Sequence, residues 1–203
     1  MPLERLRVSL FLAGEAEWRE ALGAPALGAF ADALLRAHDS LAERFATAEQ
    51  PAAVVATLVT EARTASFEEA YSPALPVAER ALRAVLIKVA QDPVPLADAE
   101  GSQAAAAWIQ NRGDPLDLLR SYVGEVFSQW SAHVLSRDAA RLCGPNSEIS
   151  GADIKRLGKD LAAEIAELAV SVPIAEPSQG SHAYWQQVVE ATFARGRRVE
   201  RQT

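Results

Sequence analysis

Apolar residues recur at steps of three and four along most of the chain, the spacing that places side chains on one face of an α-helix. Residues 25–48 show it first, and Pro25 suits the first turn of a helix. The pattern predicts further helices after Pro51, over 76–91, and in an alanine-rich stretch that ends near Gly113. The residues expected on the buried faces are Leu27, Phe30, Leu34, Leu41, Phe45, Val54, Val55, Leu58, Val59, Leu82, Val85, Leu86, Val89, Trp108 and Ile109.

The helix with the clearest boundaries is predicted from Asp114 to Leu142. Asp114 can cap its N-terminus, and Pro115 fits the first helical position. Gly144 followed by Pro145 should end it. At 1.5 Å per residue this helix is about 40 Å long, so we expect it to be the central helix of the fold. Its apolar face is Leu119, Tyr122, Val123, Val126, Phe127, Trp130 and Val134.

Two more helices are predicted in the last quarter of the chain. Ser150 should cap the first, and Asp153 stands where a capping box usually has Glu or Gln. Its apolar face is Ile154, Leu157, Leu161, Ile165 and Leu168, and it should end before Pro173. Ser181 is the expected cap of a terminal helix whose apolar residues are Tyr184, Trp185, Val188, Val189 and Phe193.

These patterns predict an all-α fold, a single irregular bundle of about six to eight helices over residues 1–203. Residues 1–14 contain an apolar run that fits either a short strand or a short helix. The segment 92–101, with Pro93, Pro95 and Gly101, is the clearest loop and a soft boundary if the chain forms two subdomains. We favour one continuous bundle because the composition is the same on both sides of this loop.

The composition limits which classes of binding partner and which cellular compartment we expect. The chain has 203 residues, of which 49% are hydrophobic, and a net charge of −7. This acidic total disfavours nucleic acid as the main partner, because phosphate binding depends on clustered Lys and Arg. A single cysteine, Cys143, excludes an internal disulfide and fits the reducing cytoplasm. No apolar stretch reaches the roughly 20 residues that cross a bilayer, so neither a membrane partner nor a membrane location is expected.

No motif predicts catalysis or metal binding. His38, His133 and His182 stand alone, without the close pairs that zinc sites use. His38-Asp39 resembles the metal-binding dipeptide of HD phosphohydrolases, but no set of further ligands accompanies it. The acids that could line a di-metal bundle core lack the Glu-x-x-His motif and are expected on solvated faces: Glu61, Glu68, Glu69, Glu125, Glu164 and Glu167. We therefore expect no enzymatic activity, no metal and no cofactor.

The C-terminal helix is the predicted partner-binding site. Its apolar residues are followed within about one turn by arginines, and Trp, Tyr and Arg are enriched at interface hot spots. The alternative is that this helix docks on its own bundle, and both can hold if the basic tail faces outward. The candidate residues are Tyr184, Trp185, Val189, Phe193, Arg195, Arg197 and Arg198.

Residues 114–198 resemble a known family. The run Leu118-Leu119-Arg120-Ser121-Tyr122-Val123-Gly124-Glu125-Val126-Phe127, followed by a charged helix end and two more helices, is similar to the C-terminal helical part of QatB-type proteins. These are helical subunits of Qat anti-phage defence operons, which also encode an ATPase, a QueC-like enzyme and a TatD-like nuclease. That family typically begins with a Gly/Ser/Tyr-rich segment, whereas this chain begins Met1-Pro2-Leu3-Glu4. The resemblance implies a relative or a fragment without that segment, which binds an enzyme of the same operon and has no catalytic residue.

Three functions follow, in order of preference. The first is a non-catalytic helical subunit that binds another protein in a bacterial multi-protein complex, with anti-phage defence as the setting that the resemblance implies. The second is a small helical subunit of a nucleoprotein complex, for which the C-terminal arginines are the only support. The third is an enzyme with an unrecognised site.

Overall fold

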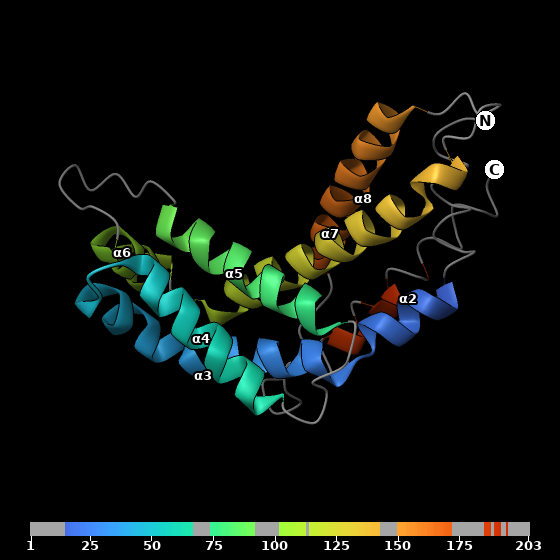
Figure 1. The fold of residues 1–203 in the computed structure, drawn as a ribbon. Coiled ribbons are helices and arrows are strands. Elements are labelled where there is room, and N and C mark those ends of the chain that lie inside the picture. The colour runs from blue at the N-terminus through green and yellow to red at the C-terminus, as the bar shows by residue number, and fades with distance from the viewer. Residues whose placement is uncertain are drawn as a thin grey trace. The chain divides into compact units, whose positions relative to one another are not determined.

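The computed structural model describes residues 15–66, 74–91, 102–112, 114–142, 150–171, 185–187, 189–191 and 194. Over these residues it contains seven α-helices and no strand, which confirms the predicted all-α class (Figure 1). None of the described helices is long and apolar enough to cross a membrane. The predicted strand or helix at residues 1–14 lies outside the described residues. The helices are α2 (Glu15–Leu22), α3 (Pro25–Thr47), α4 (Pro51–Ala65), α5 (Leu75–Gln91), α6 (Ser102–Arg112), α7 (Pro115–Leu142) and α8 (Gly151–Ser171).

The chain divides into two compact units. Unit 1 takes Met1–Ala24 and Val123–Thr203, and unit 2 is the continuous stretch Pro25–Tyr122. The second boundary falls inside α7, not in the segment 92–101, which lies outside the described residues. The prediction of a single domain stays a prediction.

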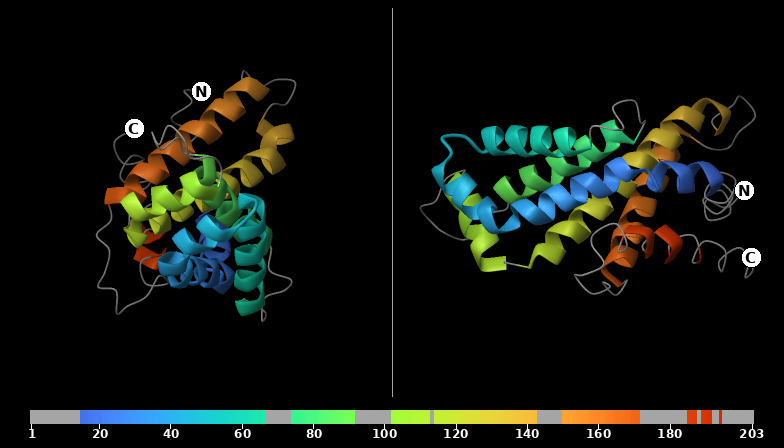
Figure 2. Two further views of the ribbon diagram at one scale, coloured as in Figure 1. Left: turned by 90° about the vertical axis from the view of Figure 1, so that its left-hand side faces the viewer. Right: turned by 90° about the horizontal axis from the view of Figure 1, so that it is seen from below.

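The core of unit 2 lies between α3 and its neighbours. Helix α3 packs against α4, α5 and α6, and α5 also contacts α4 and α6 (Figures 1 and 2). Every apolar position predicted for α3, α4 and α5 is buried, so the spacing identified these faces correctly. Tyr122, at the end of this unit, is fully buried, and its hydroxyl donates a hydrogen bond of 3.1 Å to the carbonyl oxygen of Leu27. This bond ties α7 to the first turn of α3.

Two predicted N-caps are present. The backbone N–H of Leu116 donates to Oδ1 of Asp114 at 2.9 Å, which satisfies one of the unpaired amides at the start of α7. At α8, the N–H of Asp153 donates to Ser150 Oγ at 3.2 Å, and the N–H of Ser150 donates back to Asp153 Oδ2 at 3.0 Å. This reciprocal pair is a capping box built with Asp. The Ser150 hydrogen bonds lower the pKa of the Asp153 carboxyl below its ordinary value.

Helix α2 was not predicted by the apolar spacing, because eight residues are too few to show a periodicity. A helix shorter than about 12 residues is marginal in water, so α2 depends on contacts with the rest of unit 1. Leu22 is buried, Glu17 forms an ion pair with Arg137 of α7, and Arg19 pairs with Glu190. Gly23 directly follows the helix, and its N–H donates to the Arg19 carbonyl at 2.8 Å.

Candidate functional site: the basic face of helix α5

The predicted partner-binding residues divide between buried positions and positions outside the described residues. Trp185 and Val189 are 1% and 6% exposed. The Trp185 indole N–H donates to the carbonyl oxygen of Leu22 at the end of α2, and its ring centroid lies 5.8 Å from that of Phe127. Trp185 therefore packs within unit 1, as the docking alternative supposed, and Val189 is also buried. Five candidates lie outside the described residues, and their role stays a prediction: Tyr184, Phe193, Arg195, Arg197 and Arg198.

The histidines that are described have local partners. His38 is largely buried, and its Nδ1 lies 3.2 Å from Oδ1 of the exposed Asp39. His133 is exposed, and its ring centroid lies 5.4 Å from that of Trp130, with the two rings tilted by 37°. Over the described residues, no group of three or more His, Cys, Asp or Glu could hold a metal ion.

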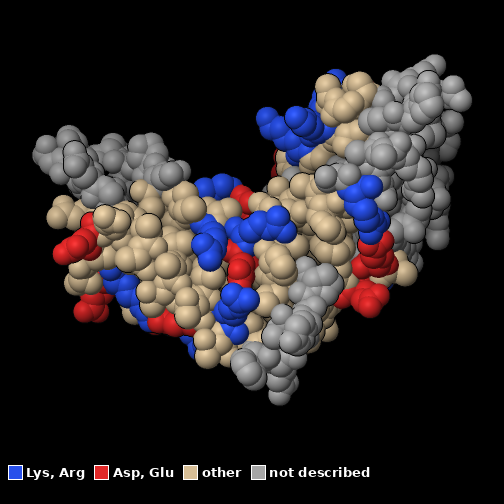
Figure 3. Space-filling model, in the orientation of Figure 1, with Lys and Arg blue, Asp and Glu red and all other residues tan. Residues whose placement is uncertain are grey.

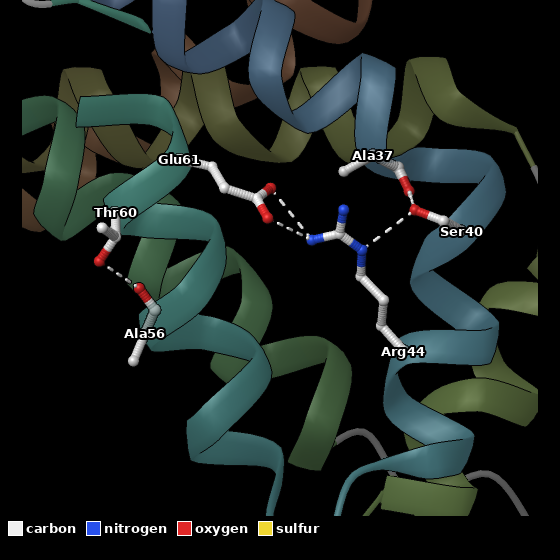
Figure 4. A network of polar contacts seen from close by, with 6 residues as sticks. All are labelled: Ala37, Ser40, Arg44, Ala56, Thr60 and Glu61. Carbon is white, nitrogen blue, oxygen red and sulfur yellow. Dashed lines mark hydrogen bonds and ion pairs between the residues drawn. The ribbon is translucent and has the colours of Figure 1, made fainter. Parts of the chain in front are cut away.

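Glu61, one of the acids considered as a metal ligand, belongs to a polar network between α3 and α4 (Figure 4). Arg44 Nη1 donates to both carboxylate oxygens of Glu61 at 3.0 Å. Its Nε donates to Ser40 Oγ at 3.2 Å, and Ser40 in turn donates to the Ala37 carbonyl at 3.0 Å. Both charged side chains are partly exposed, so such a pair contributes about 0–1 kcal/mol. This network links the two helices and leaves Glu61 occupied.

Cations gather on another surface, over α4 and α5 (Figure 3). We call this surface the basic face of α5; its residues are Arg63 of α4 and Arg80, Arg83, Ile87 and Lys88 of α5. All five are exposed. Arg80, Arg83 and Ile87 follow one another at steps of three and four, which places them in a row along one side of the helix. Arg63 extends the row sideways onto α4.

The charge of this face is opposite in sign to that of the whole chain. Helix α5 has three cations and a single carboxylate, Glu79, within a protein of net charge −7. Glu79 is 20% exposed, and its Oε1 lies 3.4 Å from Arg63 Nε in an ion pair without a hydrogen bond to that oxygen. Arg80 Nε donates to the Pro76 carbonyl at 3.0 Å, which leaves its two terminal nitrogens outside that bond. Helix α5 therefore carries one carboxylate, which is paired with Arg63 of α4, beside the cations Arg80, Arg83 and Lys88.

The stability of α5 explains the position of Lys88 but not the positions of Arg80 and Arg83. Lys88 lies in the last turn of α5, where a cation interacts favourably with the helix dipole. Arg80 and Arg83 lie in the middle of the helix, and like charges at this spacing destabilise a helix by about 0.2–0.5 kcal/mol. Ile87, between them and Lys88, is 43% exposed and is the one exposed large hydrophobic side chain among the described residues. The basic face thus combines two like charges at helical spacing with an exposed apolar side chain, and both are unfavourable on a solvated helix.

Sequence reasoning missed this surface because it followed only the apolar positions of the helix. The available signal was a second row of residues on the opposite side, Arg80, Arg83 and Ile87, at the same steps of three and four. No protein-family model matches the chain, and searches of curated proteins and of solved structures found no significant match. The evidence for a function therefore lies in the surface itself.

Proposed function

We propose that this protein is a cytoplasmic, non-catalytic helical subunit that binds another protein in a bacterial multi-protein complex. The observation that supports this most directly is the basic face of α5, where Arg80 and Arg83 precede the exposed Ile87 on the same side of the helix. Arginine is enriched at interface hot spots because its guanidinium forms several directed hydrogen bonds and its stem packs on apolar groups. Protein interfaces usually combine apolar contacts with polar and charged side chains.

The resemblance of residues 114–198 to QatB-type proteins supports a more specific version of this proposal. In that version the complex belongs to an anti-phage defence system, and the partner is an enzyme encoded in the same operon. The residues of the basic face of α5 lie between positions 63 and 88, outside the resembling stretch. Partner binding through this face therefore does not depend on the family assignment.

Site-specific photo-crosslinking tests the proposal in cells. A photoreactive amino acid is placed at position 87, and the matched control places it at Thr57, an exposed position on α4. The chain is expressed at its native level in its own host, and adducts are identified by mass spectrometry. We expect a protein adduct from position 87 that is missing from position 57.

The complex identified by crosslinking must then be reconstituted from purified components. Ile87→Asp should weaken the affinity for the purified partner by about tenfold or more, equivalent to about 1.4 kcal/mol. Thr57→Asp should leave it within about twofold, because that position lies outside the basic face. If position 87 gives no specific adduct, or if both variants bind equally, the proposal is wrong.

A nucleoprotein role is the second candidate, because the same four cations could contact phosphates. Phosphate binding has a distinct signature: the logarithm of the affinity falls linearly with the logarithm of the salt concentration, by about 0.7–0.9 per contacted phosphate. Binding of a nucleic acid with such a slope, lost in Arg83→Glu, would favour this role over protein binding.

A further inference from the structure

The arrangement of the basic face also indicates what kind of partner segment it fits. Arg80 and Arg83 are exposed on one side of α5, whose single carboxylate, Glu79, is paired with Arg63, so these two guanidinium groups favour carboxylates of a partner. The exposed Ile87 needs an apolar contact that no solvated ion supplies. A segment that satisfies both must carry acidic and apolar side chains on the same side.

The spacing of the face matches a helix. The row from Arg80 to Ile87 covers seven residue steps, which is about 10 Å at 1.5 Å per residue. A second helix laid along α5 presents its own side chains at the same steps of three and four, so carboxylates at two successive positions can meet both arginines. One turn further along, an apolar side chain would reach Ile87. This is the helix-on-helix form of peptide recognition.

We infer that the basic face of α5 is a docking site for an acidic amphipathic helix of a partner protein. This inference rests on the proposed function and specifies its partner. Arginines are well suited to it, because a guanidinium binds a carboxylate through two parallel hydrogen bonds. Nucleic acid fits less well, because a phosphate backbone offers no apolar contact to the exposed Ile87.

Designed peptides test the inference with the full chain. The acidic peptide is a fluorescent helix of about 18 residues with a Leu row flanked by Glu, and the control peptide has Lys at every Glu position. Binding is measured by fluorescence anisotropy at about 50 and 300 mM NaCl. We expect the acidic peptide to bind and to lose about fivefold or more in affinity at the higher salt, while the lysine peptide does not bind.

Variants assign the binding to this face. Arg83→Glu and Ile87→Ser should each weaken the acidic peptide about tenfold. Arg36→Glu makes the same charge change at an exposed position of α3 and should change the affinity less than twofold. Circular dichroism should show unchanged helix content in all three, because the altered residues are exposed.

Several results would overturn the inference. The first is that the acidic peptide does not bind. The second is that Arg36→Glu and Arg83→Glu reduce the affinity for the peptide equally. The third is that a single-stranded DNA of about 20 nucleotides binds more tightly than the peptide. Self-association of the chain that Arg83→Glu abolishes, without peptide binding, would identify a second copy as the occupant instead. If the peptide fails while position 87 still crosslinks to a protein, the inference falls and the proposed function stands; if both fail, both are wrong.

Discussion

Replacing Trp185 offers the sharpest test of how unit 1 is held together. Its indole N–H bonds to the carbonyl oxygen of Leu22, the last residue of α2, where no intrahelical donor is available. Its ring also packs against Phe127 of α7. One buried side chain thus both caps the short helix and fills the space beside the long one.

The expected cost differs between two variants. Trp185→Ala removes a buried aromatic side chain, which costs about 3–5 kcal/mol. Trp185→Phe keeps a ring next to Phe127 but removes the N–H, so the Leu22 carbonyl is left buried without that donor. An unsatisfied buried acceptor costs about 1–3 kcal/mol. The free energy of unfolding should therefore decrease in the order wild type, Trp185→Phe, Trp185→Ala.

Hydrogen exchange can locate the effect, and urea unfolding can measure its size. A loss of about 3 kcal/mol corresponds to about a hundredfold rise in the opening equilibrium, which exchange of the α2 amides reports directly. The control is Ile87→Ala in unit 2, where the side chain is 43% exposed and the expected change is within about 0.5 kcal/mol. If Trp185→Ala leaves both α2 exchange and the urea midpoint unchanged, the side chain is not buried and returns to the candidates for partner binding.

Three further substitutions have local and measurable effects. Tyr122→Phe removes a buried hydrogen bond and should cost about 0.5–1.5 kcal/mol in urea unfolding; because burial raises the pKa of Tyr122 well above 10.0, this variant should also leave the absorbance change near pH 10 unaltered. Ser150→Ala should lower stability by about 1 kcal/mol through the lost cap. The pKa of Asp153 is lowered from 3.8, so the capping box stabilises above that pH and is lost as pH falls through the lower folded value; an NMR titration of Asp153 should move toward 3.8 in Ser150→Ala. Gly23→Ala would place a Cβ 2.8 Å from the Arg19 carbonyl oxygen and should lower the melting temperature, with a cost of about 1–3 kcal/mol; an unchanged value would show that this turn relaxes freely.

The helices were predictable where side-chain chemistry is local. Proline at the first position of α3 and α4, and the caps Asp114 of α7 and Ser150 of α8, act within one turn, so their effect is visible in the sequence. The buried faces followed from spacing alone, because a helix repeats every 3.6 residues whatever it packs against.

The site was less accessible to sequence reasoning. Burial of Trp185 depends on Leu22, 163 residues earlier, and no local pattern can report such a pairing. An aromatic residue on a short amphipathic helix has the same signature whether it packs inward or faces a partner. Conversely, the sequence does not distinguish Arg80 and Arg83 from other surface residues, because most amphipathic helices have charged residues opposite the apolar face. Their significance came from the exposed Ile87 beside them.

The bond between Trp185 and Leu22 also sets an order of events during synthesis. Unit 2 is continuous in sequence, so all of its contacting residues have been made once Tyr122 has emerged from the ribosome. Helix α2 is made before unit 2, but its cap arrives 163 residues later. At about 5–20 residues per second, that is a wait of roughly 8–30 s. During this interval the end of α2 lacks its contact with Trp185, so Leu22 is less covered than in the finished unit and is open to a ribosome-associated chaperone.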